Sequence, residues 1–332
     1  MAFPAVASAQ GLAFFMYSKP YLSIPEQIQL LERRGMLIED PAKAAEYLQR
    51  IGYYRLSAYW HPMRQRESPS GIALDTFVPG TTFKEATDLY TFDGRLRLIM
   101  LDALERLEVS LRTEVALCLG RYHPQAHRTL NFLGRDFSSP KYRGGPSLHR
   151  EWLQRLDQRA NESKDQFAQH FRTKYPSEHM PVWIAVELLD FGPLSHLLSG
   201  MRNTDVAKIG ANFGGLKPTF VKSWVRSLSF TRNVCAHHSR LWNKPLVNQP
   251  ALAGPHIPKD LAHLQGQPDA GKRLYSIASI AQVMLRVANP RTKWRDRFVS
   301  HIGTFPSSPR VSLAAAGFPQ NWTSEPLWSS EW

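Results

Sequence analysis

The chain has 332 residues, of which 43% are apolar, so it contains enough material for a sizeable core in one large domain or two modest ones. Lysine and arginine number 41 against 28 aspartates and glutamates, and the resulting net charge of +13 is spread along the whole sequence. This excess favours a polyanionic partner, and because no run of about 18 apolar residues could cross a bilayer, nucleic acid is favoured over a membrane.

Two cysteines, Cys118 and Cys235, lie in apolar stretches that are expected to be helical. Such a pair does not make a disulfide framework, so we expect a protein of the reducing cytoplasm. The N-terminal residues contain an apolar stretch with no basic region before it, which disfavours a signal peptide. We therefore expect residues 1–16 to form a disordered extension, with Met16 as an alternative to Met1 as the start.

Apolar residues recur at helical spacing through most of the chain, which predicts an all-α fold. A capping box of Ser23 and Glu26 starts a short helix that ends at Gly35, and Asp40 starts a second helix that ends at Gly52. Turn-forming residues over 68–83 predict a hairpin-like loop. The longest helix is predicted over 82–120, and a basic loop follows over 121–148. The later predicted helices cover 148–160, 164–175, a stretch from 181 that is interrupted at 191–193, 205–213, a helix that starts at 218, and 273–289.

This pattern divides the chain into an N-terminal helical region over 17–80, a helical core over 81–300 and a C-terminal segment over 301–332. The last segment is rich in proline, serine and tryptophan. We expect it to pack back on the core as a strap rather than to form a domain.

Residues 231–240 (TRNVCAHHSR) combine arginine, asparagine and histidine within a short helical stretch. A guanidinium binds phosphate as a planar fork with no proton to lose, and histidine exchanges a proton near neutral pH. On a helix, Asn233 and His237 share a face one turn apart, and the long Arg232 side chain can reach the same place. His237 can then exchange a proton with a ribose 2′-hydroxyl or a leaving 5′-oxygen, while Arg232 stabilises phosphate charge and Asn233 orients either group. Cleavage of RNA at such a site gives a 2′,3′-cyclic phosphate and a 5′-hydroxyl.

The plain alternative is that Arg232 and His237 are cations favoured by the helix dipole, with Asn233 on the surface. A zinc site of Cys235, His237 and His238 is disfavoured, because adjacent ligands point to different faces and no second ligand pair is nearby. Spacing alone does not single out this segment. Three other pairs are spaced similarly: Arg121 with His127, Arg172 with His179, and Arg295 with His301.

Aromatic and basic residues gather in a second segment over 53–61, with Arg64 and Arg66 after it. Such rings can stack on bases beside cations that bind phosphate, although we expect at least half of them to belong to the core. His238 and Arg240 add positive charge beside the first motif. The candidate RNA-binding residues are Tyr53, Tyr54, Arg55, Tyr59, Trp60, His238 and Arg240.

Several common enzyme signatures are missing from the sequence: a phosphate-binding glycine loop, a serine nucleophile elbow, paired metal-binding carboxylates and a dinucleotide fingerprint. Neither a metal nor a cofactor is therefore expected. In the long predicted helix, the spacing of Glu108 and Arg112 predicts a structural ion pair without a catalytic role.

Four segments, in this order, resemble the Abi-like proteins of bacterial abortive infection, the AbiD and AbiF group, whose domain is similar to HEPN nucleases. They are residues 19–27 (KPYLSIPEQ), 51–60 (IGYYRLSAYW), 181–195 with Pro-Val-Trp, Glu187 and Phe-Gly-Pro-Leu-Ser, and 232–243 (RNVCAHHSRLWN). The closing segment from Gly317 to Trp328 also resembles the end of that family. The resemblance thus covers nearly the whole chain after Tyr17.

This resemblance implies a HEPN-like helical bundle in which Arg232 and His237 form the family's Arg-x4-His element and Asn233 is the polar residue after the arginine. It also implies a homodimer in which two such motifs face one another, and RNA as substrate and as a possible bound regulator. The implied role is phage defence or toxin-like growth arrest, as in a toxin-antitoxin system.

Three hypotheses follow from these observations. The leading one is a metal-independent endoribonuclease that acts as an abortive-infection effector. The alternative is a non-catalytic RNA-binding protein of a defence or toxin-antitoxin system, in which the cationic helix end and the 53–60 segment hold a structured RNA. The third is a protein-interaction module whose positive charge is incidental.

Overall fold

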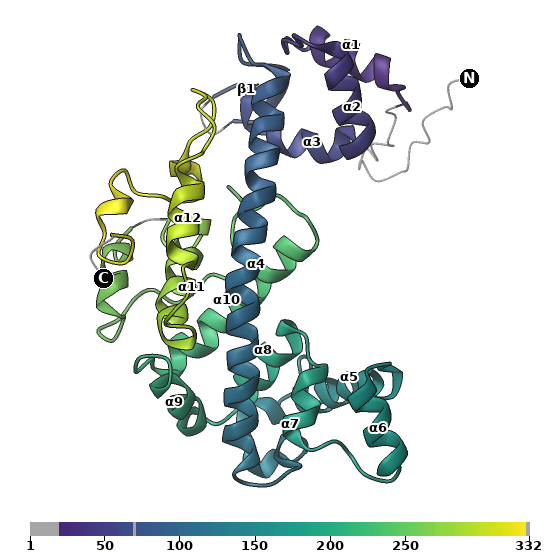
Figure 1. Cartoon of the computed structure of the whole chain (residues 1–332), viewed down its shortest axis with the longest axis vertical. Helices are drawn as coiled ribbons and strands as arrows, with labels where there is room; N and C mark the ends of the chain where they lie inside the picture. The colour runs from purple at the N-terminus through teal and green to yellow at the C-terminus, as the bar shows by residue number, and fades with distance from the viewer. Residues whose placement is uncertain (1–19, 69–70, 268, 330–332) are drawn as a thin grey trace, which may run out of the picture. The chain divides into compact units, whose positions relative to one another are not determined.

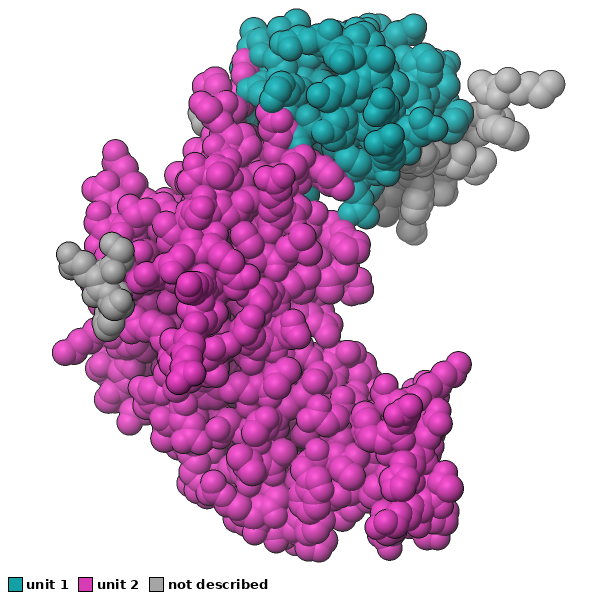
Figure 2. All heavy atoms as spheres, in the orientation of Figure 1, with its two compact units in different colours: residues 1–87 teal, residues 88–332 magenta. Residues whose placement is uncertain are grey.

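The computed structural model describes residues 20–68, 71–267 and 269–329. The predicted extension over 1–16, and with it the choice between Met1 and Met16, lies outside the described residues. The chain forms two compact units, Met1–Thr87 and Asp88–Trp332 (Figure 2). The all-α prediction is confirmed, because a two-stranded hairpin is the only sheet in the described part of the chain.

The first unit contains three helices and the hairpin (Figure 1). Both predicted helix starts are confirmed: the Ser23 backbone N–H donates to the Glu26 carboxylate at 2.7 Å, and the Lys43 N–H donates to Asp40 at 2.9 Å. These bonds satisfy N–H groups that have no partner within a helix. The hairpin starts earlier than predicted, with Arg64 opposite Phe77. The elements are α1 (Ile24–Arg33), α2 (Pro41–Ile51), α3 (Tyr53–Trp60), η1 (His61–Met63), β1 (Arg64–Arg66) and β2 (Ala73–Phe77).

The long helix α4 (Phe83–Gly120) has nearly the predicted bounds, and the boundary between the two units falls within it. Thr82 and Glu85 form a second capping box: the Thr82 N–H donates to the Glu85 carboxylate at 2.8 Å, and the Glu85 N–H donates to the Thr82 hydroxyl at 3.2 Å. One face of α4 carries apolar side chains at three- and four-residue spacing that are fully buried in the second unit, whereas Leu98, Val109 and Leu117 are exposed. Among the buried side chains are Leu89, Leu96, Leu104, Leu107 and Leu111.

The second unit contains the rest of α4 and the remaining helices. Helix α10 packs against α8, α9 and α11, and α5 packs against α8. Helix α10 therefore lies at the centre of this unit. The elements are η2 (Ala126–Arg128), η3 (Leu130–Phe132), η4 (Arg135–Ser138), α5 (Leu148–Glu162), α6 (Gln166–Lys174), α7 (Val182–Ala185), η5 (Val186–Leu188), α8 (Phe191–Gly200), α9 (Asn203–Ala211), α10 (Pro218–Ala236), η6 (Lys259–Leu264), α11 (Leu274–Ala288), α12 (Trp294–Ile302), η7 (Leu313–Ala316) and η8 (Trp322–Ser324).

One predicted helix boundary is wrong, and one helix was not predicted. The residues Phe191, Gly192 and Pro193 do not interrupt a helix but form the first turn of α8, and the chain is extended just before them, at Leu189 and Asp190. A proline is tolerated there because the first N–H groups of a helix have no intrahelical acceptor. Helix α12 was not predicted, although it buries one apolar side chain per turn through Trp294, Phe298 and Ile302.

The C-terminal segment packs on the last two long helices through aromatic rings. The Tyr275 ring of α11 lies 5.0 Å from Phe318, and the Phe298 ring of α12 stacks 5.1 Å from Trp328. The Trp294 indole N–H donates to the Ile99 carbonyl of α4 at 2.7 Å. Residues after Thr304 thus complete the core of the second unit. Within the described residues, no helix combines the length and the apolar character needed to cross a bilayer.

His127 is a buried imidazole in this unit. It is 1% exposed, and neither ring nitrogen has a hydrogen-bond partner among the residues that the structure describes. Burial, together with the positive charge of Arg128, lowers the pKa of His127 to about 3. The folded protein therefore holds His127 in its neutral form.

We expect this histidine to make the protein acid-sensitive. Because the unfolded imidazole binds a proton below its ordinary pKa while the folded one stays neutral to about pH 3, stability is complete at neutral pH and is lost as the pH falls. His127 should account for a loss of roughly 2 kcal/mol in the free energy of unfolding between about pH 6.5 and pH 5. Urea unfolding of wild-type and His127→Phe protein measures it, and at about pH 8 the two differ by packing alone. An equal acid-induced loss in both proteins would show that His127 does not cause it.

Candidate functional site

Helix α10 carries the predicted motif and ends inside it. The helix starts with Pro218, buries Trp224, Val225 and Leu228, and stops after Ala236. His237 is the C-cap residue, and His238 has a φ of 54°, the left-handed value that glycine usually supplies.

Two backbone hydrogen bonds close this helix end. The His238 N–H donates to the Cys235 carbonyl at 3.0 Å, and the Ser239 N–H donates to the Val234 carbonyl at 3.0 Å. Together they form a Schellman motif with a histidine in the glycine position. His237 therefore lies just beyond the regular helix. The His237 N–H still donates to the Asn233 carbonyl at 2.9 Å, so the two residues stay one helical turn apart, and both are exposed.

A buried carboxylate of α4 fixes the chain directly after this turn. Asp93, which is 0% exposed, accepts from the Leu241 N–H at 3.1 Å and from the Trp242 N–H at 2.7 Å. It also pairs with Arg97 at 2.5 Å, one turn along the helix. A buried carboxylate is stable only with such partners, so Asp93 determines where the motif segment leaves α10.

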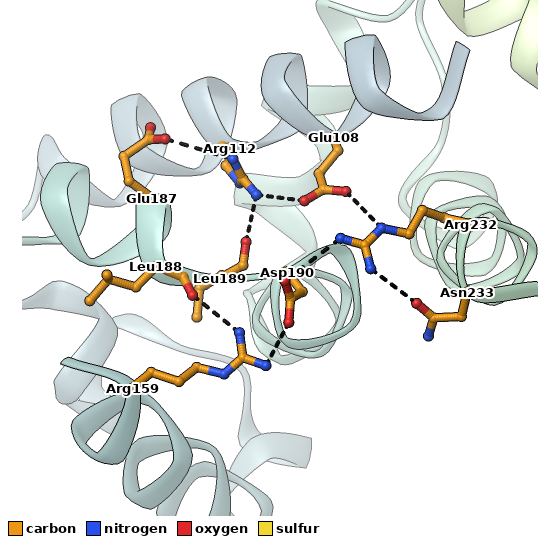
Figure 3. A network of polar contacts seen from close by, with 9 residues as sticks. All are labelled: Glu108, Arg112, Arg159, Glu187, Leu188, Leu189, Asp190, Arg232 and Asn233. Carbon is orange, nitrogen blue, oxygen red and sulfur yellow. Dashed lines mark hydrogen bonds and ion pairs between the residues drawn. The ribbon is translucent and has the colours of Figure 1, made fainter. Parts of the chain in front are cut away.

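The Arg232 guanidinium lies between two carboxylates from other helices (Figure 3). Its Nε is 3.5 Å from Glu108 of α4, and one terminal nitrogen is 3.6 Å from Asp190, which precedes α8. Its other terminal nitrogen donates to the Asn233 side-chain oxygen at 3.3 Å. Ion pairs, rather than the carbonyls of the helix end, therefore set the position of Arg232. This argues against the helix-dipole interpretation for that residue.

The predicted pair of Glu108 and Arg112 is confirmed at 2.5 Å, and it belongs to the same network. Arg112 also donates to the Leu189 carbonyl at 2.7 Å and lies 3.7 Å from the Glu187 carboxylate. Burial raises the pKa of Glu108, and the charges of Arg112 and Arg232 oppose that rise. The two arginines thus stabilise the charged form of the buried Glu108 carboxylate.

Asp190 joins a third arginine to the network. Arg159 of α5 donates to the Asp190 carboxylate at 2.6 Å and to the Leu188 carbonyl at 3.2 Å (Figure 3). Although burial favours its neutral form, the bond from Arg159 and the charges of Arg232 and Arg112 hold the pKa of Asp190 below its usual range. Asp190 therefore stays ionised between Arg159 and Arg232.

His237 and Asn233 are exposed beside this network. Among the described residues, no hydrogen bond joins the Arg232 and His237 side chains, so the structure brings the three motif residues to one helix end without linking them directly. His238 is exposed and Arg240 is half-buried just after them. At the end of α10, the imidazole of His237 and the amide of Asn233 are thus exposed, while the Arg232 guanidinium is half-buried between two carboxylates.

The second predicted RNA-binding segment is only partly available. Tyr59 and Trp60 are 1% and 0% exposed, so the prediction that they bind RNA is wrong: their ring faces are used in the core of the first unit. Tyr53 is half-buried, and its hydroxyl accepts from Arg34 at 3.1 Å. Tyr54, 92% exposed, and the exposed Arg55 are the residues of this segment that RNA can reach.

The three competing pairs of arginine and histidine have structural roles. His127 is buried, and His301 is buried with a ring nitrogen 3.0 Å from the Phe92 carbonyl. Arg172 donates to the carbonyls of Ala160 and Ser163. Burial and hydrogen bonding therefore distinguish these three pairs from Arg232 and His237, which spacing alone could not do.

Cys235 lies behind the motif with its thiol fully buried. Burial, with the nearby Asp93 charge, raises the pKa of Cys235 to about 12. The thiol is buried whereas His237 and His238 are exposed, and within the described residues no group of three or more His, Cys, Asp or Glu side chains is placed to hold a metal ion.

The model of the Abi-like protein family matches residues 46–243, which is more than half of the chain. This range includes α3, the network around Arg232 and the whole motif. The chain belongs to the Abi-like protein family. No curated protein matches it significantly, and no solved structure does.

The sequence did not identify the partners that hold Arg232 in this Abi-like protein. The position of Asp190 was visible in the sequence, because an aspartate directly before an apolar helical stretch is typical of an N-cap residue. In the structure its side chain caps no helix and binds arginines instead. Arg159, on a different helix, carried no local signal at all.

We expect both thiols to be unreactive in the folded protein. Burial raises the pKa of Cys118 as well as that of Cys235, so neither forms a thiolate near neutral pH. At about pH 8, Ellman's reagent should titrate far less than one thiol per chain within minutes, and both thiols after denaturation in guanidinium chloride. Rapid reaction of one thiol in the folded protein would contradict the burial of the segment behind the motif.

Double-mutant cycles should rank the ion pairs of the network. The coupling energy of Glu108 with Arg112 is expected at roughly 1–2 kcal/mol, because the pair is short and mostly buried. Glu108 with Arg232, a longer contact, should give about 0.5 kcal/mol. Both coupling energies come from urea unfolding of three single variants, Glu108→Gln, Arg112→Met and Arg232→Met, and of the two double variants that contain Glu108→Gln. The control is Glu105→Gln, because Glu105 is exposed on α4. A reversed ranking would contradict the geometry in Figure 3.

Proposed function

We propose that this protein is a metal-independent endoribonuclease that acts in abortive infection, through a HEPN-like site formed by Arg232, Asn233 and His237. The observation that carries the proposal is the end of α10, where an exposed histidine and asparagine adjoin an arginine that three side chains, Glu108, Asp190 and Asn233, hold in place (Figure 3). Membership of the Abi-like family supports a role in phage defence.

In the proposed reaction, the ribose 2′-oxygen attacks the adjacent phosphorus and the bond to the 5′-oxygen breaks. His237 accepts the proton of the 2′-hydroxyl, and the leaving 5′-oxygen takes up a proton from a second imidazole. Arg232 stabilises the added negative charge on the phosphate, and Asn233 orients the phosphate or the imidazole. A homodimer supplies the second imidazole as His237 of the other copy.

The charge on Arg232 is shared with Glu108 and Asp190 before RNA binds. Both contacts exceed the usual length of a charge-assisted hydrogen bond, about 2.7–2.9 Å. A phosphate oxygen can therefore compete for the guanidinium without breaking a strong bond. Glu108 and Asp190 act here as positioning residues, since they act on the reaction only through Arg232.

A non-catalytic RNA-binding protein is the second candidate. It is favoured by the engagement of all three Arg232 nitrogens with protein groups and by the exposed Tyr54 and Arg55 in the first unit. In this alternative the arginine is structural and the surface holds an RNA without cutting it.

Cleavage of a 5′-labelled RNA by purified protein separates the two candidates. We expect activity that survives EDTA and leaves a 2′,3′-cyclic phosphate. His237→Ala should lower the cleavage rate by roughly 10²–10⁴-fold, the usual contribution of a general acid or base. Arg232→Ala should lower it by about 10²–10³-fold, because a charge-stabilising donor is lost.

His179→Ala is the matched control, since it removes an exposed histidine from one of the competing pairs. It should cleave at the wild-type rate. Circular dichroism melting shows that each variant is folded. Full activity of folded His237→Ala rules out the proposed chemistry, and tight, salt-sensitive binding without any cleavage by the wild-type homodimer favours the second candidate.

A further inference from the structure

A pocket of about 870 Å³ lies beside the candidate site in the second unit. Helices α5 and α8 form two of its walls, and residues around η4 contribute a third. Its apolar lining includes Leu148, Trp152 and Pro193. The Trp152 indole N–H donates to the Pro193 carbonyl at 2.9 Å, so this part of the wall is fixed. The volume is in the range of small-molecule and nucleotide pockets.

The cations of this pocket differ from those of the neighbouring network. Lys141 and Arg155 line it, and within the described chain neither side chain has a hydrogen bond or an ion pair. The lining residue Arg159, in contrast, is paired with Asp190. An unpaired cation on a pocket wall is available to an anionic ligand, whereas a paired one has to be released first.

His196 lines the same pocket, and the charges of Arg155 and Lys141 act on its imidazole. Partial burial and the charges of Arg155, Arg226 and Lys141 lower the pKa of His196, and no carboxylate opposes them. The pocket does have acidic lining residues, Asp136, Glu151 and Glu162, and the last accepts from Gln158 at 2.9 Å. The charges that act on the His196 imidazole are nevertheless all positive. This wall of the pocket is suited to a phosphate.

Arg159 connects the pocket to the candidate site. Its side chain lines the pocket, and its guanidinium binds the carboxylate of Asp190 that also contacts Arg232. Arg226 lies on α10, less than two turns before Arg232. The charge of Arg226 acts on His196.

We propose that this pocket binds a nucleotide of a single RNA strand next to the bond that is cut. Its phosphate lies at Lys141, Arg155 and His196, and its base lies against the apolar wall at Leu148 and Pro193. The inference rests on the proposed function for the identity of the strand. It adds a binding site outside the motif, one that determines which stretch of the strand the protein holds.

Binding of a fluorescein-labelled 2′-O-methyl hexauridylate to the full-length wild-type protein tests this site by fluorescence anisotropy. The probe lacks the 2′-hydroxyl that the proposed cleavage needs, so every residue of the candidate site stays in place. Arg155→Ala should raise Kd about five- to tenfold at low salt and reduce the salt slope of log K by about 0.7, the value for one lost phosphate contact on a single strand. Leu148→Glu should weaken binding at least as much, and an acidic residue at the start of α5 is compatible with that helix.

Arg150→Ala is the control, because it removes the same charge from an exposed position of α5 outside the pocket. Its Kd should stay within about twofold of the wild type, because an exposed side chain outside the pocket makes no direct contact with the bound phosphate. Equal weakening by Arg150→Ala and Arg155→Ala overturns the pocket and leaves general attraction to a basic surface. Binding of uridine monophosphate as tight as that of the hexamer overturns the assignment to a strand.

A parallel cleavage assay separates this inference from the proposed function. Normal cleavage with unchanged probe binding by Arg155→Ala refutes the pocket alone. Pocket-dependent binding without cleavage by the wild-type protein refutes the nuclease alone.

Discussion

The buried carboxylate of Asp93 is the interaction on which the geometry of the candidate site depends. A carboxylate that is 0% exposed needs partners for its charge, and here these are Arg97 and the backbone N–H groups of Leu241 and Trp242. The two backbone N–H groups belong to the chain that leaves the motif. If the residues after His238 shifted along α4, the buried Asp93 charge would lose these hydrogen bonds, which costs several kcal/mol. The same helix presents Glu108 to Arg232, so α4 fixes the motif on both sides.

Charge is balanced within the network, and the lengths of the contacts decide which arginine is held least tightly. Three arginines, Arg112, Arg159 and Arg232, face three carboxylates, Glu108, Glu187 and Asp190. Arg112 and Arg159 have short bonds of 2.5 and 2.6 Å, whereas both ion pairs of Arg232 exceed 3.4 Å. The short bonds are part of the scaffold. Arg232 is oriented by two more distant acids, so it is the arginine of the network whose contacts cost least to break.

Local signals in the sequence identified most elements but not the contacts between them. Capping boxes at Ser23 and Thr82 and the apolar period of α4 depend on neighbouring residues, and the structure has helices where they indicate. The partners of Arg232 come from α4 and from the residue before α8, so no spacing rule could pair them. Asp93 was visible as an acid one turn before Arg97, but its burial and its bonds to Leu241 and Trp242 depend on tertiary structure. The prediction of RNA-binding rings over 53–60 was wrong for Tyr59 and Trp60, because composition alone does not show which aromatic side chains are buried in the core.

The left-handed turn at His238 connects backbone strain with access to the motif. A non-glycine residue at this position costs about 1 kcal/mol, and glycine would close the Schellman motif without that cost. The turn stops α10 at Ala236, and the next residue, His237, therefore lies beyond the last helical turn, with its side chain in solvent. Asn233, one turn earlier on α10, is exposed as well, whereas Val234 and Cys235 between them are buried. The left-handed turn thus ends α10 directly after an exposed strip that includes Asn233 and His237.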